Sequence, residues 1–332
     1  MKELEKLLEI QTVSGYEYKN MSYIQELFNN IGLDVFSDNI YNVIGLKKGT
    51  NAKYNVLVDA HFDTIGLMVS DILEGGFLSF VSVGGVDTRV LPALSVTIHG
   101  KENIKGVIGV KPPHLISDGY DKTYKIEDLF IDTGYSYEKI CEYIEVGDII
   151  SFNSDITYLL NNQLSCCGLD NKAGVYSMYE IIKNVCNDRI NLYGIASVGE
   201  ETGLNGAKAF SKTNEFDLAV VIDVTFGQTP DLTEYPNFVG KGPVLTLGPS
   251  LSKEYNNKIR NYAKNNNINI QYEVEGGNTG TNAWIYHSSG ISVPTIMISI
   301  PLKYMHTPYE VVSKNDISDT IKLVSGFLNE IF

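Results

Sequence analysis

The sequence predicts an α/β protein in which a sheet with helices on both faces is interrupted by a small inserted β-rich domain. Two observations support this fold class. After Gly168, helical and strand patterns alternate along the chain, as they do in sheets covered by helices on both sides. Over residues 71–158 the pattern changes to short β-rich runs separated by glycines, which is typical of a separate β domain. We therefore expect one domain built from residues 1–70 plus 159–332, with residues 71–158 inserted in its middle.

Composition and charge narrow the class of protein. The chain has 332 residues, a length typical of about two domains. Of these residues 43% are hydrophobic, enough to form a sizeable core. A net charge of −14 repels phosphate backbones and anionic lipid surfaces. No run approaches the ~18 apolar residues of a membrane helix, and the first residues alternate charge with leucine, unlike a signal peptide. We expect a cytoplasmic protein that binds neither nucleic acid nor membranes.

The cysteines indicate a reducing environment. Four cysteines without CxxC spacing are too few for a disulfide framework in a chain of this length. We expect reduced, mostly buried thiols at Cys141, Cys166, Cys167 and Cys186.

The individual elements follow from the spacing of apolar residues. Leucines at helical spacing predict a helix over residues 3–10, and a second amphipathic pattern covers residues 21–28. The apolar run at 54–59 is typical of a buried parallel strand. The last helix is preceded by the capping-box pattern Ser313-x-x-Asp316. Further helices are expected around 175–185, 255–262 and 317–331, and further strands at 190–197, 218–223 and 293–300.

Polar side chains follow several predicted strands, where open α/β sheets keep their sites. His61 comes directly after the strand 54–59, and Asp63 could accept a hydrogen bond from its second ring nitrogen and fix its tautomer for a metal. The competing interpretation of His61 is a solvated loop histidine. Asp170 precedes a helix that begins near Lys172; an aspartate there ordinarily caps the helix, but its carboxylate could instead bridge two cations.

Four further candidates lie at strand ends. Glu200 and Glu201 follow the strand 190–197, and two adjacent carboxylates are costly unless a cation or solvent offsets their charge. They form either an exposed acidic turn or a pair in which one binds metal and the other moves protons. Asp223 ends an apolar strand, where a buried, hydrogen-bonded aspartate is the alternative, and His306 follows the strand 295–300.

Taken as a set, these candidates predict a two-metal site. Two neutral imidazoles and three carboxylates leave a pair of divalent ions with a net charge of about +1. Such a shell suits two zinc-like ions ~3.5–4 Å apart that hold an activated water. The five candidate ligands are His61, Asp170, Glu201, Asp223 and His306, whereas His99, His114 and His287 have no such placement and are expected to be structural or surface residues.

At these residues the chain resembles the tetrahedral, cobalt- or zinc-dependent aminopeptidases, which include glutamyl, leucyl and deblocking enzymes and are often labelled endoglucanase or cellulase. The resemblance implies a zinc-exopeptidase-like mixed sheet sandwiched by helices. It also implies that residues 71–158 form a dimerisation domain and that dimers assemble into a hollow dodecamer. The matching segments are VDAHFDTIG (58–66), CGLDNKAG (167–174), SVGEETGLNGA (197–207), VIDVTFGQTPD (221–231), GKGPVL (240–245), TGTNAW (279–284) and IPLKYMHTPYEVV (300–312).

The resemblance also implies roles for the candidate ligands. His61 and Asp223 would hold one divalent ion, Glu201 and His306 the other, and Asp170 would bridge the two. Residue types do not distinguish zinc from cobalt, and manganese also fits such a ligand set.

Other positions acquire roles by the same resemblance. Glu200 would be the general base that takes a proton from the bridging water, and Asp63 would be the partner of His61. The Asp170–Asn171 peptide would be cis, a costly geometry that is tolerated where it aims a ligand. The family often has TGTDA where this chain has an amide at Asn282, which changes polarity on the substrate side or local hydrogen bonding.

The function predicted in this way is hydrolysis of the N-terminal residue from peptides. The alternatives are another two-metal hydrolase of the deacylase or carboxypeptidase type, and a glycoside hydrolase as the cellulase label suggests. The last needs two carboxylates in an aromatic-lined cleft, and Trp284 is the only tryptophan. A binding protein on a decayed hydrolase fold would lack ligands or the base, whereas all are present. Loss of activity in chelator separates the metal-dependent hydrolases from a glycoside hydrolase.

Overall fold

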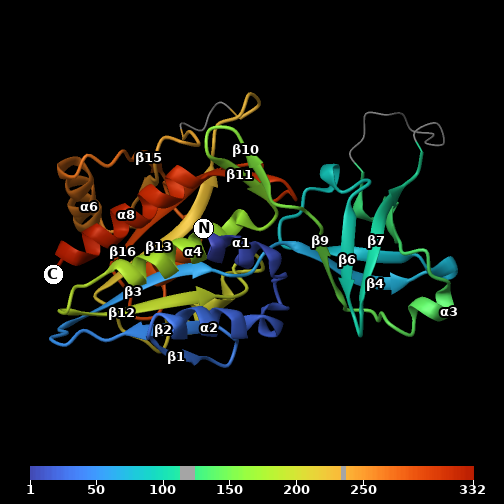
Figure 1. Cartoon of the computed structure of the whole chain (residues 1–332), viewed down its shortest axis with the longest axis horizontal. Helices are drawn as coiled ribbons and strands as arrows, with labels where there is room; N and C mark the ends of the chain where they lie inside the picture. Colours follow the sequence, from blue (N-terminus) through green and yellow to red (C-terminus); the bar gives the residue numbers. More distant parts are fainter. Residues whose placement is uncertain (113–123, 233–236) are drawn as a thin grey trace.

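The computed structural model describes residues 1–112, 124–232 and 237–332, and contains a large mixed sheet flanked by helices beside a closed six-stranded barrel (Figure 1). This architecture confirms the predicted fold class. The barrel and the sheet lie at opposite ends of the long axis of the molecule (Figure 1). The boundaries expected at residues 71 and 158 stay a prediction, and His114 lies outside the described residues.

Four parallel strands form the centre of the large sheet. Its order is β1-β2-β12-β3-β13-β16-β17-β11-β10, with β14 beside β16 and β15 beside β14. The neighbours β12, β3, β13 and β16 are parallel, so their carboxyl ends meet at one edge. The strands are β1 (Asp34–Ser37), β2 (Val43–Lys47), β3 (Tyr54–His61), β10 (Thr157–Leu159), β11 (Gln163–Cys166), β12 (Ile190–Ser197), β13 (Leu218–Phe226), β14 (Val244–Leu247), β15 (Gln271–Val274), β16 (Thr295–Lys303) and β17 (Glu310–Ser313).

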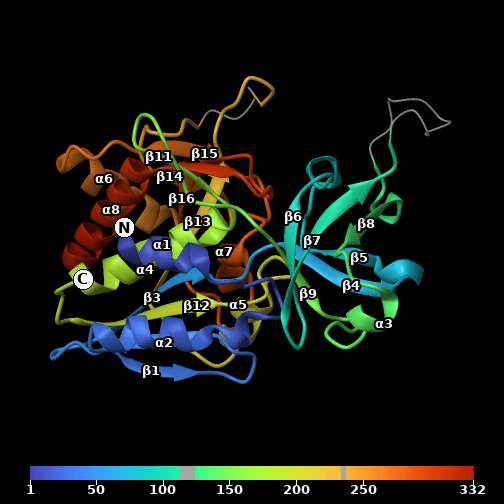
Figure 2. The same cartoon turned by 45° about the vertical axis from the view of Figure 1, so that its right-hand side comes forward.

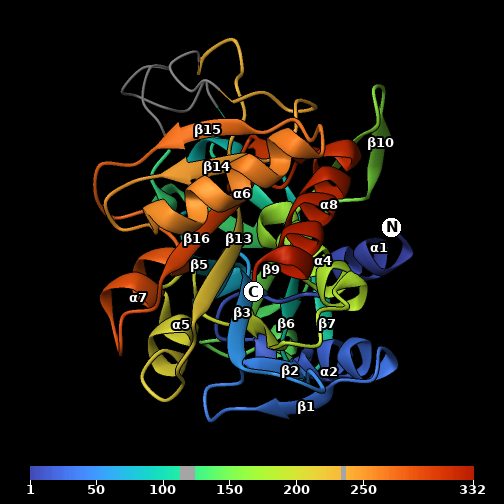
Figure 3. The same ribbon diagram turned by 90° about the vertical axis from the view of Figure 1, so that its left-hand side faces the viewer.

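Helices cover both faces of this sheet because its central strands are apolar on both sides. Along β13, Val220 and Ile222 pack into one core cluster, whereas Ala219 and Val221 pack into another. The first cluster lies under α1 (Lys2–Glu9), α2 (Met21–Asn30), α4 (Leu169–Asn184), α6 (Lys253–Asn265) and α8 (Lys314–Glu330). The second lies under α5 (Asn205–Phe210) and α7 (Asn282–Ser288), on the opposite side in Figure 3. The short 3-10 helix η1 (Glu17–Lys19) follows α1.

Figure 2 shows the barrel beside the large sheet. The barrel has a hydrophobic core of its own. Alternate side chains along its strands, such as Leu67 and Val69, point inward and are buried. The closed order is β4 (Gly66–Ile72), β5 (Leu78–Val83), β8 (Leu129–Asp132), β7 (Asn103–Val110), β6 (Ser95–His99) and β9 (Ile149–Phe152). Its connections contain η2 (Glu74–Gly76), η3 (Thr88–Val90), η5 (Ile126–Asp128) and α3 (Tyr137–Ile140).

The capping box expected at the start of the last helix does not form. Ser313 caps α8 as expected, but its hydroxyl accepts from the Asn315 N–H, and the Asp316 carboxylate does not close a capping box. That carboxylate instead accepts the N–H groups of Gly240 and Gly242 at 2.6 and 2.8 Å, because a neighbouring loop reaches it.

The cysteines are free, as expected, but they are not mostly buried. Cys166 is buried and Cys167 is half-buried, whereas Cys141 and Cys186 are exposed. Both exposed cysteines lie just beyond the ends of helices, where a helical pattern does not fix burial. Among the described residues, no helix has both the length and the apolar character needed to cross a membrane.

Candidate metal centre

The five predicted ligands come together at the carboxyl edge of the central strands. His61 ends β3, Asp223 lies near the carboxyl end of β13, Glu201 follows β12, and His306 follows β16. Asp170 lies at the start of α4, just beyond β11. The side chains fall into two groups that share Asp170: His61, Asp170 and Asp223 in one, and Asp170, Glu201 and His306 in the other.

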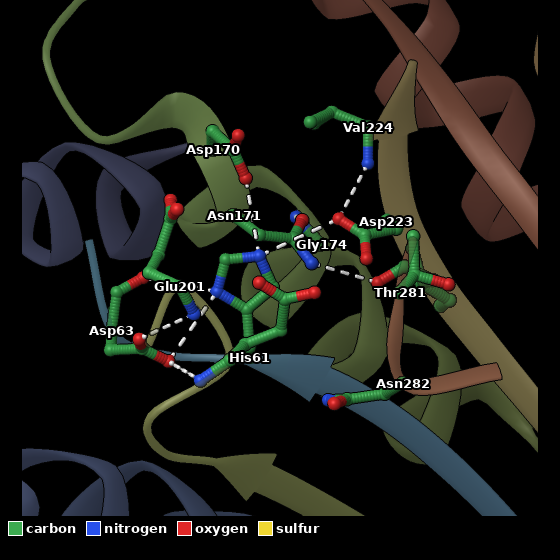
Figure 4. A network of polar contacts seen from close by, with 12 residues as sticks. His61, Asp63, Asp170, Asn171, Gly174, Glu201, Asp223, Val224, Thr281 and Asn282 are labelled. Carbon is green, nitrogen blue, oxygen red and sulfur yellow. Dashed lines mark hydrogen bonds and ion pairs between the residues drawn. The ribbon is translucent and has the colours of Figure 1, made fainter. Parts of the chain in front are cut away.

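The distances place Asp170 between two imidazoles. Its Oδ1 lies 3.1 Å from His61 Nε2, and its Oδ2 lies 3.5 Å from His306 Nε2. His61 Nε2 is also 3.5 Å from Asp223 Oδ1, and His306 Nε2 is 3.4 Å from Glu201 Oε2. Figure 4 shows the His61 ring facing Asp170 and Asp223. Each oxygen of Asp170 therefore serves a different group.

These spacings fit bound divalent ions. Two ligand atoms about 2.05 Å from a tetrahedral zinc ion are about 3.3 Å apart, close to the observed nitrogen–oxygen separations. Imidazole nitrogen and carboxylate oxygen are ligands that zinc, cobalt and manganese accept. The donor set therefore suits two ions that share the Asp170 carboxylate.

Backbone carbonyls orient both histidines. His61 Nδ1–H donates to the carbonyl of Asp63 at 3.0 Å, and His306 Nδ1–H donates to the carbonyl of Gly85, also at 3.0 Å. The Nε2 atoms are thereby turned towards the carboxylates. For His61 this bond goes to the backbone of Asp63 rather than to the carboxylate that we expected, whose Oδ1 lies 3.6 Å away.

The Asp63 carboxylate has a different task, because it holds the acidic turn after β12. It accepts the N–H groups of Glu200 and Glu201 at 3.0 and 3.1 Å. It also accepts the hydroxyl hydrogen of Ser14. The fully buried Asp63 therefore fixes the backbone that carries both neighbouring glutamates.

The structure reveals two supporting acids that the sequence reasoning missed. Glu310, on β17, is buried and accepts the N–H groups of Asp170 and His306, each at 3.1 Å. Glu17 is buried and accepts the N–H of Gly199 at 3.0 Å. An acid within the apolar run after Pro308 was the signal for Glu310, whereas nothing in the local sequence marks Glu17.

Asp170 does not cap α4. Its carboxylate lies between His61 and His306, and the helix N–H of Gly174 is accepted by Asn171 instead. The Asp170–Asn171 peptide is cis, as the resemblance implied. Asn171 is fixed by two bonds, since it accepts the Gly174 N–H at 3.0 Å and donates to the Ile222 carbonyl at 2.8 Å.

The crowding of acids shifts their pKa values. Burial raises the pKa of Glu200 and Glu201 well above the ordinary range, and neighbouring carboxylates add to the rise. Burial opposes the charged form of Asp170, but hydrogen bonds with His306 and His61 outweigh it and hold its pKa well below the usual value. So many buried acids around one point call for a compensating cation.

Asn282 lies beneath the site rather than on its substrate side. It is buried, and its Nδ2 donates to Asp59 Oδ1 at 3.1 Å and to Ser197 Oγ at 2.9 Å. The change from the family's usual acid therefore affects local hydrogen bonding. Of the other histidines, His99 bonds Ser151 and Asn103 in the barrel, and His287 lies on α7.

A cavity of about 580 Å³ opens at the candidate metal centre. The ligands and Glu200 line it, together with residues of β13, β15 and β16 and of the segments that follow β12 and β15. Side chains in the walls include Leu204, Thr225, Phe226, Glu273, Glu275 and Met297. A peptide end could therefore reach the candidate metal centre from the surface.

Comparison with known proteins finds similar chains over nearly the whole length of this one. The family model described as M42 glutamyl aminopeptidase matches residues 41–323. The lysyl aminopeptidase of Pyrococcus furiosus is 32% identical over 99% of this chain and 96% of its own. The aminopeptidase APDkam598 of Desulfurococcus kamchatkensis superposes with a TM-score of 0.93 at 30% identity, covering 99% of this chain and 94% of its own. The Pyrococcus horikoshii TET1 peptidase, which assembles into a tetrahedron or a large octahedral shell, gives 0.87 at 31% identity over 99% of both chains.

Proposed function

Because the chain belongs to the M42 glutamyl aminopeptidase family and is therefore an aminopeptidase, we propose that it works with two divalent ions held by the residues described above. The observation that carries this proposal is the pair of ligand groups sharing Asp170. His61 and Asp223 would hold one ion, and Glu201 and His306 the other, with Asp170 between them. Zinc, cobalt and manganese all suit this donor set.

The ions would supply Lewis-acid chemistry, by polarising the scissile carbonyl and by lowering the pKa of the attacking water. The protein supplies the base. Glu200 lines the cavity but belongs to neither ligand group. Its carboxylate would therefore stay free to accept a proton when both ions are bound. Glu200 would take the proton of the water and pass it to the leaving amine.

Asp63 would act as a positioning residue. Its carboxylate accepts both backbone N–H groups of the acidic turn, so it sets the direction of Glu200 relative to Glu201. Glu310 would do the same for the second group through Asp170 and His306. Contacts of this kind orient the ligands of a metal site.

We also propose how the chain assembles and where it is located. Residues 71–158 would form the dimer contact, and dimers would build a closed dodecamer. The large shells of the Pyrococcus horikoshii relative support self-association of this kind. A cytoplasmic location fits the four free cysteines.

The experiment that tests this function removes and restores the metal. Chelator-treated protein should not hydrolyse an aminoacyl-anilide, and about two equivalents of zinc, cobalt or manganese per chain should restore turnover. A peptide with a free N-terminus and an amidated C-terminus serves as the matched substrate, because an aminopeptidase would process it and a deacylase or carboxypeptidase would not. Full turnover in the metal-free protein would refute the two-ion centre.

A further inference from the structure

The active-site cavity contains two carboxylates that the proposed chemistry does not use. Glu273 lies on β15, and Glu275 lies just beyond its end. Side chains alternate along a strand, so these two residues share a face. Both are half-buried and line the cavity beside the candidate ligands.

Hydrogen bonds fix the Glu273 carboxylate through one of its two oxygens. Its Oε2 accepts the hydroxyl hydrogen of Thr225 and an Nδ2 hydrogen of Asn237, the latter at 3.1 Å. Among the residues that the structure describes, no donor reaches Oε1. The carboxylate is therefore fixed in direction while one oxygen stays available to a ligand.

Glu275 adds a second negative charge without a counter-ion. Its side chain makes no hydrogen bond or ion pair within the described part of the chain. Burial raises the pKa of Glu273, and the negative charge of Glu275 adds to the rise. None of the described residues that line the cavity is a lysine or an arginine. A cationic ligand would remove the cost of placing these acids together.

The distance from the candidate metal centre to Glu273 and Glu275 is about the length of a long side chain. Asp223 and Thr225 both line the cavity and point to the same face of β13. Two residues along a strand span about 7 Å, and Thr225 is the residue that binds Glu273. A lysine ammonium group sits on a flexible four-carbon stem, which suits this span, and Leu204, Phe226 and Met297 offer apolar walls to the stem.

We propose that Glu273 and Glu275 make the enzyme prefer peptides whose N-terminal residue is lysine or arginine. This inference rests on the proposed function, since it assigns the side chain of the residue being removed to this wall of the cavity. An N-terminal glutamate would add a third carboxylate to the pair and is disfavoured.

Steady-state kinetics of the metal-loaded protein test the preference directly. The substrates are the p-nitroanilides of lysine, leucine and glutamate, which differ in side-chain charge. We expect kcat/KM for lysine to exceed that for leucine at least 10-fold and glutamate to be poorest, because hydrogen bonds to charged groups are the strong ones.

Substitutions locate the effect. Glu275→Gln and Glu273→Gln should each lower the lysine-to-leucine ratio of kcat/KM by about 10- to 100-fold, and Glu275→Lys should shift preference towards glutamate. Glu254→Gln, on the exposed side of α6, is the matched control and should keep the wild-type ratio. If Glu273→Gln fails to fold because Thr225 and Asn237 lose their acceptor, the Glu275 variants decide.

The possible outcomes distinguish a failure of the basic preference from a failure of the proposed aminopeptidase function. A wild-type enzyme that hydrolyses leucine or glutamate anilide better than lysine anilide overturns the basic preference and leaves the aminopeptidase intact. Unchanged ratios in the Glu275 variants overturn it as well. A metal-loaded protein that hydrolyses none of the three substrates overturns the proposed function itself.

Discussion

The adjacent residues Glu200 and Glu201, in the turn after β12, differ in their surroundings. Both backbone N–H groups bond the same Asp63 carboxylate, but Glu201 lies 3.4 Å from His306 Nε2, whereas Glu200 lies outside both ligand groups. Residue type cannot distinguish the two. The difference comes from which way each side chain leaves the turn.

Replacing each glutamate by glutamine should separate a base from a ligand. Glu200→Gln keeps the side-chain shape but removes the proton acceptor, so kcat should fall by ~10²–10⁴-fold while both metals stay bound. Glu201→Gln substitutes a neutral ligand for a charged one and should weaken or lose one metal. Turnover and metal stoichiometry measured on both variants decide. Wild-type turnover in Glu200→Gln, or metal loss in that variant alone, would reverse the roles.

Because Asn282 is a neutral amide, the buried hydrogen-bond network around Asp59 contains one carboxylate rather than two. Asp59 is completely buried and already accepts hydrogen bonds from Tyr286, Ser197 and Asn282. Burial raises its pKa to about 6, although these three bonds work in the other direction. A carboxylate in place of the Asn282 amide would face that of Asp59 at about the same separation.

Asn282→Asp should therefore destabilise the fold in a pH-dependent way. The paired acids would retain a proton in the folded state, whereas each unfolded aspartate titrates near ~3.9. Because the folded state then binds more protons, the free energy of unfolding falls as pH rises above about 4, by about 1.4 kcal/mol per pH unit until the folded pair ionises.

Chemical denaturation at pH 5 and pH 8 measures this effect. The deficit relative to wild type should be small at pH 5 and on the order of 3–5 kcal/mol at pH 8, as for other uncompensated buried charges. Asn261→Asp, on the exposed side of α6, is the control and should be neutral at both pH values. A pH-independent deficit would mean that no shared proton forms.

At the scale of elements, the barrel contributes directly to the metal centre. The loop after β5 brings the Gly85 carbonyl to His306 Nδ1. A Cβ atom at this position would lie 2.8 Å from that nitrogen, so no larger residue fits without moving the ring. The barrel therefore positions a ligand carried by the other part of the molecule.

Gly85→Ala should weaken one ion more than the other. Displacing His306 disturbs the group with Glu201, and loss of such supporting contacts typically costs 10–100-fold in metal affinity. Competitive chelator titration resolves the two affinities. Gly276→Ala is the matched control, because nothing lies within 4 Å of its added Cβ. Two unchanged affinities in Gly85→Ala would show that the barrel loop has no part in binding.

The sequence predicts these elements best where local patterns suffice. The buried strands β12 and β13 and the terminal helix follow from apolar spacing alone, and the candidate ligands follow from their positions at strand ends. The supporting contacts do not. Lys172 donates to the carbonyl of Ile10 and Glu17 accepts from Gly199. These two bonds join residues 162 and 182 positions apart, so they cannot be predicted from local spacing.

At the scale of the whole molecule, the exposed apolar side chains of the barrel need an explanation. Val81 on β5 and Val107 on β7 are 45% and 50% exposed, and Val146 is 61% exposed. The inward side chains of the barrel already form its core, so these outward ones have no role in the fold. If residues 71–158 form the dimer contact, as we propose, these side chains would be covered by another copy.

We therefore expect a closed homo-oligomer assembled through the barrel. Twelve chains of 36.8 kDa give a particle of about 440 kDa, which light scattering at micromolar protein with metal present should detect. Val81→Lys together with Val107→Lys should reduce the mass to that of small species, because two desolvated charges per chain oppose the contact. Ile291→Lys, exposed but outside the barrel, should still form at least dimers. A wild-type particle of one chain under these conditions would refute the assembly, and a full-sized double variant would place the contact elsewhere.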